Sequence, residues 1–292
     1  MKFVLEILRG MVIGLANIIP GVSGGTMMVS MGIYDTLIHC ITHLFKEFKK
    51  SILTLLPYAV GMVLAIGGLS FALKWAFAVY PLPTNTLFIG LILGGLPAIF
   101  KQIKGSKKRD SILGGILFVL FFALVIFMAT LKETQDTGAV ISLSVLEVLK
   151  LTLMGCIASA TMVIPGVSGS MMLMLMGYYY PVIGAIKNLI NALVALDGGA
   201  ILYNVGILLP FGVGVVIGIF AIAKLIEILL AKWKCITYGA ILGLVVASPF
   251  AILMGLSLPG FNLVQVIVSV LTFILGFAAA WLLARKDEKP AA

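Results

Sequence analysis

The chain of 292 residues is 62% hydrophobic and only 11% charged, whereas an ordinary soluble domain carries about 25% charged residues. No Asp, Glu, Lys or Arg occurs in 52–73, 111–131 or 262–284. A water-soluble surface needs more charge than this, so the composition excludes a cytosolic enzyme and indicates a polytopic membrane protein. The net charge of +9 does not indicate nucleic-acid binding, because the basic residues lie in short segments between apolar runs.

In chain order, two segments interrupted by Pro and Gly, 10–45 and 151–186, each precede three apolar runs. Most of these runs approach the roughly 20 residues that a helix needs to span a bilayer, and 85–100 is the short one. They therefore predict three transmembrane helices after each interrupted segment. The runs lie at about 52–73, 85–100, 111–131, 204–230, 236–256 and 262–284.

The two interrupted segments share a sequence motif. Residues 19–24 read Ile-Pro-Gly-Val-Ser-Gly, and residues 164–169 repeat the same six letters. Further glycines match in order, namely Gly10 with Gly155, Gly32 with Gly177, Gly61 with Gly214, and Gly90 with Gly243. Ordered matches of this kind indicate an internal duplication. We predict two related halves within one transmembrane domain: 1–140, with a hairpin turn at 20–25, and 145–292, with a hairpin turn at 165–170.

Each motif interrupts a helix inside an apolar segment. The ten residues from Gly10 to Ile19 predict about 15 Å of helix, half the hydrocarbon thickness, before Pro20 and the following glycines open a turn. A single kink of this kind is tolerated in a spanning helix, but two at corresponding positions favour the broken helices of a transporter. The predicted fold is an all-α polytopic membrane protein of two inverted-topology repeats, each a re-entrant helical hairpin plus three transmembrane helices.

The distribution of basic residues supports this topology. If each hairpin enters and leaves the membrane on one side, each half crosses the membrane three times. Because three is an odd number, the second half begins on the opposite side and the two halves have opposite orientations. We expect both termini of the multi-pass chain at the cytoplasmic face of the cell membrane. Of the 20 Lys and Arg residues, only four would then face outward: Lys74, Lys132, Lys150 and Lys187. This is the bias expected from the positive-inside rule. If both motif segments spanned the membrane fully, the lysines of 46–51 would move outside, so re-entry is favoured.

The stretches IPGVSGGT at 19–26 and IPGVSGS at 164–170, on this duplicated plan, resemble the polyprenyl-phosphate transporter family (PopT-like). The resemblance covers nearly the whole chain. It implies a flippase that moves undecaprenyl phosphate, a lipid carrier of cell-envelope synthesis, from the outer to the cytoplasmic leaflet for reuse. The second copy has Ser170 and Met171 where the first has Gly25 and Thr26, so the two hairpins are not chemically equivalent.

The residues of the turns suit an anionic head group. After each turn a helix begins with free backbone N–H groups and a positive dipole end, hydroxyl groups add donors, and glycines allow close approach. Helix N-capping without a ligand is the alternative for the serines. The predicted substrate-binding residues of the turns are Pro20, Gly21, Ser23, Gly24, Gly25, Thr26, Pro165, Gly166, Ser168, Gly169 and Ser170.

An acid and a base three residues apart precede each turn: Glu6 with Arg9, and Glu147 with Lys150. Arg9 suits bidentate binding of a phosphate, and Lys150 supplies a point charge, so both are predicted to bind substrate. The alternative for both is a charged anchor at a helix end. Glu6, Glu147 and Asp35 are candidate coupling residues.

Other polar residues are less specific. Asn17 and Thr161 either line the substrate pathway or satisfy hydrogen bonds between helices. His39 and His43 are four residues apart, as a metal-binding pair would be, but the sequence places no third ligand near them, so we expect interfacial histidines and no metal. Glu227 is predicted to pair with a lysine three residues earlier, with proton coupling as the alternative.

Three classes of function follow from these features. A lipid-phosphate transporter and a secondary transporter of a small water-soluble anion or ion would use the same paired hairpins, and the resemblance favours the first. An intramembrane lipid-modifying enzyme is disfavoured, because no acid–base or metal constellation is evident. We expect no cofactor and no nucleic acid. The expected partners are the lipid phosphate, membrane lipids and a coupling ion, H⁺ or Na⁺; the sequence identifies neither that ion nor an oligomeric state.

Overall fold

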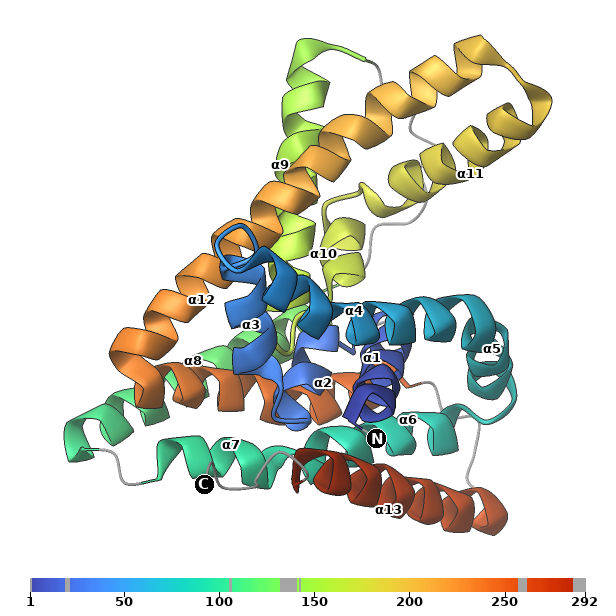
Figure 1. The fold of residues 1–292 in the computed structure, drawn as a ribbon. Helices are drawn as coiled ribbons and strands as arrows, with labels where there is room; N and C mark the ends of the chain where they lie inside the picture. Colours follow the sequence, from blue (N-terminus) through green and yellow to red (C-terminus); the bar gives the residue numbers. More distant parts are fainter. Residues whose placement is uncertain are drawn as a thin grey trace. The chain divides into compact units, whose positions relative to one another are not determined.

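The computed structural model describes residues 2–18, 22–104, 107–131, 141, 143–256 and 262–285. Within these ranges all regular secondary structure is helical (Figure 1), and six helical segments are long and apolar enough to cross a membrane. The prediction of an all-α, multi-pass membrane protein is confirmed. The six segments are Phe48–Val79, Pro81–Ile103, Lys108–Thr130, Val145–Val163, Gly198–Met254 and Leu263–Ala284.

Large apolar side chains point away from the protein on several of these helices. Phe71, Val119 and Leu275 are each more than half exposed. A soluble protein rarely exposes this much apolar surface, and a helix that is hydrophobic on all sides suits a lipid environment. The exposed faces are therefore the lipid-facing surface of the membrane segments.

The chain forms two compact units. One consists of Met1–Thr130, Ile164–Val167 and Ala223–Ala292, and the other of Leu131–Val163 and Ser168–Ile222. The first unit thus combines the helices of the first half with the second motif turn and the last helices of the second half. The division into two related halves, which concerns the sequence repeat, stays a prediction.

Helix boundaries in the first half follow its glycines and prolines. The π-helical segment η1 contains Gly67 and Gly68, and the helix that starts at Pro81 has this proline at its first position. Gly95 separates two helices within the run predicted at 85–100. The elements are α1 (Lys2–Ile18), α2 (Gly24–Ser30), α3 (Tyr34–Thr42), α4 (Phe48–Leu64), η1 (Ala65–Leu69), α5 (Ser70–Val79), α6 (Pro81–Gly94), α7 (Leu96–Ile103) and α8 (Lys108–Thr130).

The second half has a similar order of elements. Trp233 has non-helical backbone angles (φ −137°, ψ 53°), so α12 contains two helices, in agreement with the two apolar runs predicted there. Helices α10 and α11 are bent by 108° relative to each other. The elements are α9 (Val145–Val163), α10 (Gly169–Leu175), α11 (Tyr179–Ala195), α12 (Gly198–Met254) and α13 (Leu263–Arg285).

The helix that precedes the first motif turn is longer than predicted, and the corresponding helix before the second turn has a similar length. Helix α1 has 17 residues and α9 has 19, which correspond to about 25 Å and 28 Å of helix. The prediction of a half-length helix that begins at Gly10 is therefore wrong. The residues before Gly10 include several strong helix formers, such as Leu5, Glu6 and Leu8, so the helix already begins at Lys2.

The helix after each motif turn ends in the same way. Gly32 follows α2 with φ 71°, and Gly177 follows α10 with φ 77°. Glycine adopts this left-handed conformation without the steric cost of a side chain, and it allows two hydrogen bonds that close the helix end. In both copies the backbone N–H of the glycine and the backbone N–H of the residue after it each donate a hydrogen bond to a backbone carbonyl oxygen of the preceding helix. The duplicated glycine therefore serves the same local function twice.

Matching glycines also allow two close helix crossings. In the first unit Gly10 and Gly61 lie where α1 crosses α4, and in the second unit Gly155 and Gly214 lie where α9 crosses α12. A methyl group added at Gly61 or at Gly214 would lie 2.1 or 1.9 Å from a carbonyl oxygen of the opposite helix. Membrane helices associate closely through such small residues. The same crossing thus occurs once in each unit.

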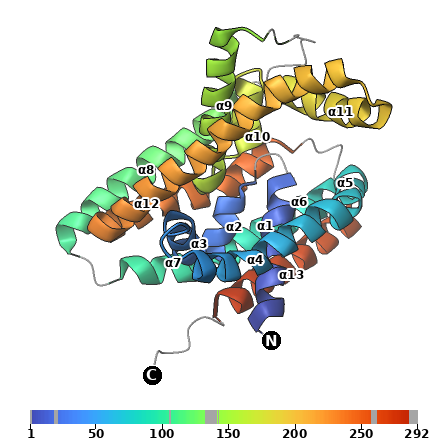
Figure 2. The same cartoon turned by 45° about the horizontal axis from the view of Figure 1, so that its top comes forward.

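Within the first unit, the last helix of each half packs against a helix of the other half, an arrangement that we call exchanged packing. Helix α13 packs against α6, and α8 packs against the C-terminal part of α12 (Figure 2). A methyl group added at Gly90 of α6 would lie 2.2 Å from the carbonyl oxygen of Phe273, and one added at Gly243 of α12 would lie 2.3 Å from that of Phe118. The final helix of each half therefore packs against a helix of the other half.

The exchanged packing can be tested with Gly243→Ala. The added methyl group forces α12 away from α8, and we expect a loss of stability of about 1–3 kcal/mol, measured as a lower Tm of the purified protein in detergent. Gly115→Ala on α8 is the matched control, because nothing lies within 4 Å of its added Cβ. This control should unfold at the original temperature or slightly higher, since Ala favours helix more than Gly. Equal Tm values for the two variants would contradict the close crossing.

Candidate functional site

The second motif turn, Ile164–Val167, contacts the first motif inside one compact unit. The Ser23 hydroxyl donates a hydrogen bond to the carbonyl oxygen of Ile164 at 3.3 Å, across 141 residues of sequence. The backbone N–H of Gly166 donates to Oγ1 of Thr26 at 2.7 Å. Gly166 has φ 80°, and an added Cβ would lie 2.6 Å from the carbonyl oxygen of Leu244. The two motifs that the sequence analysis singled out are therefore joined by direct hydrogen bonds.

Asn17 stabilises the turn of the first motif. Its Oδ1 accepts a hydrogen bond from the backbone N–H of Gly24 at 3.1 Å, and a Cβ added at Gly24 would lie 2.5 Å from the same oxygen. Ser23 occupies the N-cap position of α2 with extended backbone angles, but its side chain makes no capping bond. Asn17 thus satisfies the first N–H group of α2, a role that the spacing of the motif did not reveal.

The second motif is capped differently. The Ser168 hydroxyl accepts a hydrogen bond from the backbone N–H of Met171 at 3.4 Å and lies 2.9 Å from the Ser170 hydroxyl. The Thr161 hydroxyl donates to the carbonyl oxygen of Ala158, in its own helix, at 2.8 Å. Ser168 therefore caps α10 itself, which is the capping alternative considered for the serines.

The turn residues are enclosed by protein in this conformation. The exposed fraction is 4% for Ser23, 0% for Thr26 and 7% for Ser168. Gly24, Gly25, Pro165 and Gly169 are buried as well, whereas Gly166 and Ser170 are partly buried. Pro20 and Gly21, which belong to the same predicted site, lie outside the described residues. The hydroxyl groups of the turns are thus engaged with protein partners and not turned toward solvent.

A pocket of about 730 Å³ opens next to Arg9, between α1, α3 and α4. Its polar lining residues include Glu6, Arg9, Thr36, Lys49, Lys50 and Thr54, and its apolar wall includes Phe3 and Leu53. Three cationic side chains and one carboxylate give the pocket a positive charge that attracts anions. The sequence predicted roles for Arg9 and Glu6 but gave Lys49 and Lys50 a place only in the topology, because the proximity of these lysines to Arg9 arises from the packing of α1 against α4.

The two charged pairs that precede the turns have different environments. Arg9 is only 2% exposed, and its guanidinium Nη2 donates to the carbonyl oxygen of Leu283 in α13. In the second unit, Lys150 is partly exposed and forms an ion pair with Glu147 at 2.8 Å, and the Tyr178 hydroxyl donates to the same carboxylate at 3.2 Å. Arg9 is therefore part of the protein interior, while Lys150 remains accessible to solvent.

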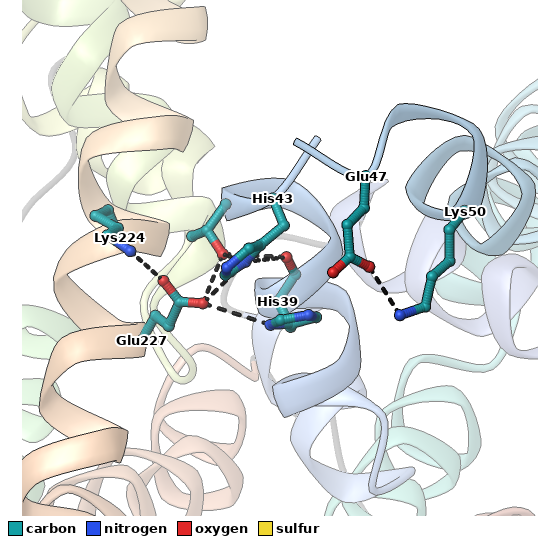
Figure 3. Close-up of polar contacts among 7 residues, drawn as sticks. His39, His43, Glu47, Lys50, Lys224 and Glu227 are labelled. Carbon is teal, nitrogen blue, oxygen red and sulfur yellow. Dashed lines mark hydrogen bonds and ion pairs between the residues drawn. The ribbon is translucent and has the colours of Figure 1, made fainter. Parts of the chain in front are cut away.

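Two further acidic residues have defined partners in the first unit. The Tyr238 hydroxyl donates to Oδ1 of Asp35 at 2.7 Å. Lys50 forms an ion pair with Glu47 at 2.7 Å (Figure 3), and its ammonium group lowers the pKa of the Glu47 carboxyl. Lys49 also lines the pocket.

Paired helices interrupted inside the apolar region are features of secondary membrane transporters. The chain belongs to the family described as VCA0040-like, undecaprenyl phosphate translocase-like, which matches residues 13–258. This membership confirms the resemblance found from the two motifs.

Two relatives are similar over most of the chain. A polyprenyl-phosphate transporter of Staphylococcus aureus (strain NCTC 8325 / PS 47) is 33% identical over 284 residues, which are 96% of either chain. A polyprenyl-phosphate transporter of Vibrio cholerae serotype O1 (strain ATCC 39315 / El Tor Inaba N16961) is 29% identical over 263 residues, 85% of this chain and 77% of the relative. No solved structure matches the chain. Both relatives are named as transporters and not as enzymes, in agreement with the expectation from the sequence.

The bond between the two motifs can be tested with Thr26→Val. Valine removes the acceptor of the Gly166 N–H, and an unsatisfied buried donor costs about 1–3 kcal/mol. Thr26→Ser keeps the hydroxyl and is the matched control. Hydrogen exchange measured by mass spectrometry should be faster in peptides that contain Gly166 for Thr26→Val, and close to wild type for Thr26→Ser. Slow exchange in both variants would show that Thr26 does not hold the second turn.

Proposed function

We propose that this protein transports a polyprenyl phosphate from the outer to the cytoplasmic leaflet, which returns the lipid carrier to cell-envelope synthesis. The observation that carries the proposal is the pocket of about 730 Å³ beside Arg9, whose lining includes the cationic side chains of Arg9, Lys49 and Lys50. The two relatives named as polyprenyl-phosphate transporters support the choice of substrate.

The chemistry of the pocket suits a phosphate monoester attached to a lipid. A phosphate that leaves water for an apolar environment needs fixed donors to replace its hydration. A guanidinium group can bind two phosphate oxygens at once, ammonium groups add positive charge, and the hydroxyl groups of Thr36 and Thr54 add neutral donors. We propose that the head group occupies this pocket at the cytoplasmic end of its path.

The apolar wall of the pocket favours a lipid over a small water-soluble anion. Phe3 and Leu53 line the pocket and are 54% and 60% exposed. Apolar side chains that are exposed in a membrane protein face lipid, so an isoprenoid tail attached to the bound phosphate could remain in the bilayer beside them. A site built for a small hydrated anion would need no such opening toward lipid.

We further propose that transport requires the two motif turns to separate. The hydrogen bonds from Ser23 to Ile164 and from Gly166 to Thr26 close the path in the conformation described. When these bonds break, the donors of both turns become available to the phosphate. The residues predicted from the sequence for this step are Pro20, Gly21, Ser23, Gly24, Gly25, Thr26, Pro165, Gly166, Ser168, Gly169 and Ser170.

On the outer side, Lys150 is the proposed first contact of the phosphate, because its ammonium group is partly exposed and its ion pair with the neighbouring Glu147 can open to release it. Glu6, Glu147 and Asp35 remain the candidate residues for coupling to H⁺ or Na⁺. Asn17 bonds to the backbone N–H of Gly24 in the first turn, and Thr161 bonds to a carbonyl oxygen of its own helix, so we assign them a positioning role.

The inverted orientation of the two halves is part of the proposal. It is supported by the reciprocal packing of α6 with α13 and of α8 with α12, since two halves related by a two-fold axis would make each contact twice. An axis in the membrane plane would let the site face either leaflet by rocking of one half against the other.

Transport itself is tested with the purified protein in liposomes that contain a polyprenyl phosphate, by measuring the leaflet in which the phosphate is found over time. The expected result is protein-dependent movement of the lipid between leaflets. Uptake of inorganic phosphate without movement of the lipid would instead support a transporter of a small anion.

The role of the pocket can be tested with Lys49→Gln. We expect about tenfold weaker binding of a polyprenyl phosphate, equivalent to about 1.4 kcal/mol, because one of three cationic groups is removed. Lys46→Gln is the matched control, since Lys46 is a nearby exposed lysine outside the set that lines the pocket. Binding to the detergent-solubilised protein should change less than twofold in this control. Equal losses in both variants would indicate general charge attraction and not a defined site.

The topology can be tested with single introduced cysteines. Cys40 and Cys235 are buried, so their failure to react would not be informative, and Cys156 is first replaced by Ser. Lys46→Cys and Lys187→Cys place thiols at exposed positions that we assign to opposite sides of the membrane. An impermeant thiol reagent on intact cells should label Lys187→Cys and should label Lys46→Cys only after permeabilisation. Labelling of Lys46→Cys in intact cells would overturn the topology.

A further inference from the structure

The structure brings the only two histidines of the chain next to an acidic residue that is remote in sequence. His39 lies in α3, His43 caps the end of α3, and Glu227 lies in α12 (Figure 3). The Nδ1 atoms of His39 and His43 are 3.5 and 3.1 Å from Oε1 of Glu227. Each of the three residues offers one candidate ligand atom, and these three atoms all lie within 4.8 Å of one another.

We propose that His39, His43 and Glu227 bind a divalent transition-metal ion, with zinc as the best fit. Zinc is bound by imidazole nitrogen and carboxylate oxygen at about 2.0–2.2 Å, so neighbouring ligand atoms lie about 3–4 Å apart. The observed separations need only a small rotation of the side chains to reach this spacing. Two imidazole ligands disfavour Mg²⁺ and Ca²⁺, which prefer oxygen donors.

The surroundings of Glu227 orient its carboxylate toward the histidines. Lys224 binds Oε2 at 2.6 Å, and the Thr42 hydroxyl donates to Oε1 at 2.9 Å. Groups of this kind fix the orientation of a metal ligand from outside the coordination sphere. The positive charge of Lys224 lowers the affinity for a cation, so the site is expected to bind zinc reversibly and not permanently.

The site is accessible to an ion from solvent. The side chains of His39, His43 and Glu227 are 50%, 25% and 20% exposed. Three protein ligands leave a fourth position of a tetrahedral zinc ion open to water. The ion would connect α3, which follows the first motif, to α12, and so restrain the motif relative to a long membrane helix.

Metal binding is tested on the full-length protein, purified with an affinity tag that contains no histidine and treated with a chelator. Cobalt(II), which substitutes for zinc and absorbs visible light, should give the spectrum of a site with nitrogen and oxygen ligands, and zinc should displace it at one equivalent. Zinc should also raise the Tm, because it binds the folded state. Absence of both the cobalt spectrum and the Tm increase in the wild-type protein would overturn the proposal.

Variants identify the ligands. His39→Gln combined with His43→Gln, and separately Glu227→Gln, should each weaken zinc binding by at least about tenfold. Glu47→Gln is the matched control, because Glu47 is a nearby carboxylate that pairs with Lys50 and is not among the proposed ligands; zinc affinity should stay within about twofold of wild type. Undiminished binding in the double histidine variant, or an equal loss in Glu47→Gln and Glu227→Gln, would overturn the assignment.

Discussion

A helix interrupted inside a membrane leaves backbone N–H and C=O groups that lipid cannot satisfy, and the rest of this structure depends on how they are satisfied. Asn17 accepts from the N–H of Gly24, Thr26 accepts from that of Gly166, and Ser23 donates to the carbonyl group of Ile164. Each motif alone would be left with unpaired polar groups. The two motifs therefore satisfy some of each other's polar groups.

Close packing of the helices supports this arrangement. In lipid the hydrophobic effect does not draw apolar helices together, so association depends on van der Waals contact and on hydrogen bonds between helices. Glycines at the crossings of α1 with α4 and of α9 with α12 bring backbones into direct contact, as do those between α6 and α13. The same glycines that allow the close approach make these positions intolerant of larger residues.

We propose two separate functions for the charged residues in this framework. Arg9 is buried and bonded to α13, and it also lines a pocket with Lys49 and Lys50, so one residue links helix packing to the proposed binding of a phosphate. The proposed zinc ligands lie on α3 and α12, where an ion would restrain the first motif. Binding of substrate and restraint of the motif are thus proposed to act on neighbouring elements of the same unit.

The sequence by itself determined the membrane class, the apolar runs and the family, because hydropathy and a repeated motif are local properties of the chain. It also placed the interrupted helices correctly, although it made the first of them too short, since helix formation extends through residues before Gly10 that the motif does not include.

Only the tertiary structure decided which remote groups meet. Glu227 joins His39 and His43, and Gly166 joins Thr26, through packing of helices far apart in sequence. Such contacts depend on how the side chains of several helices fit together at once, and no local pattern of residues records that fit.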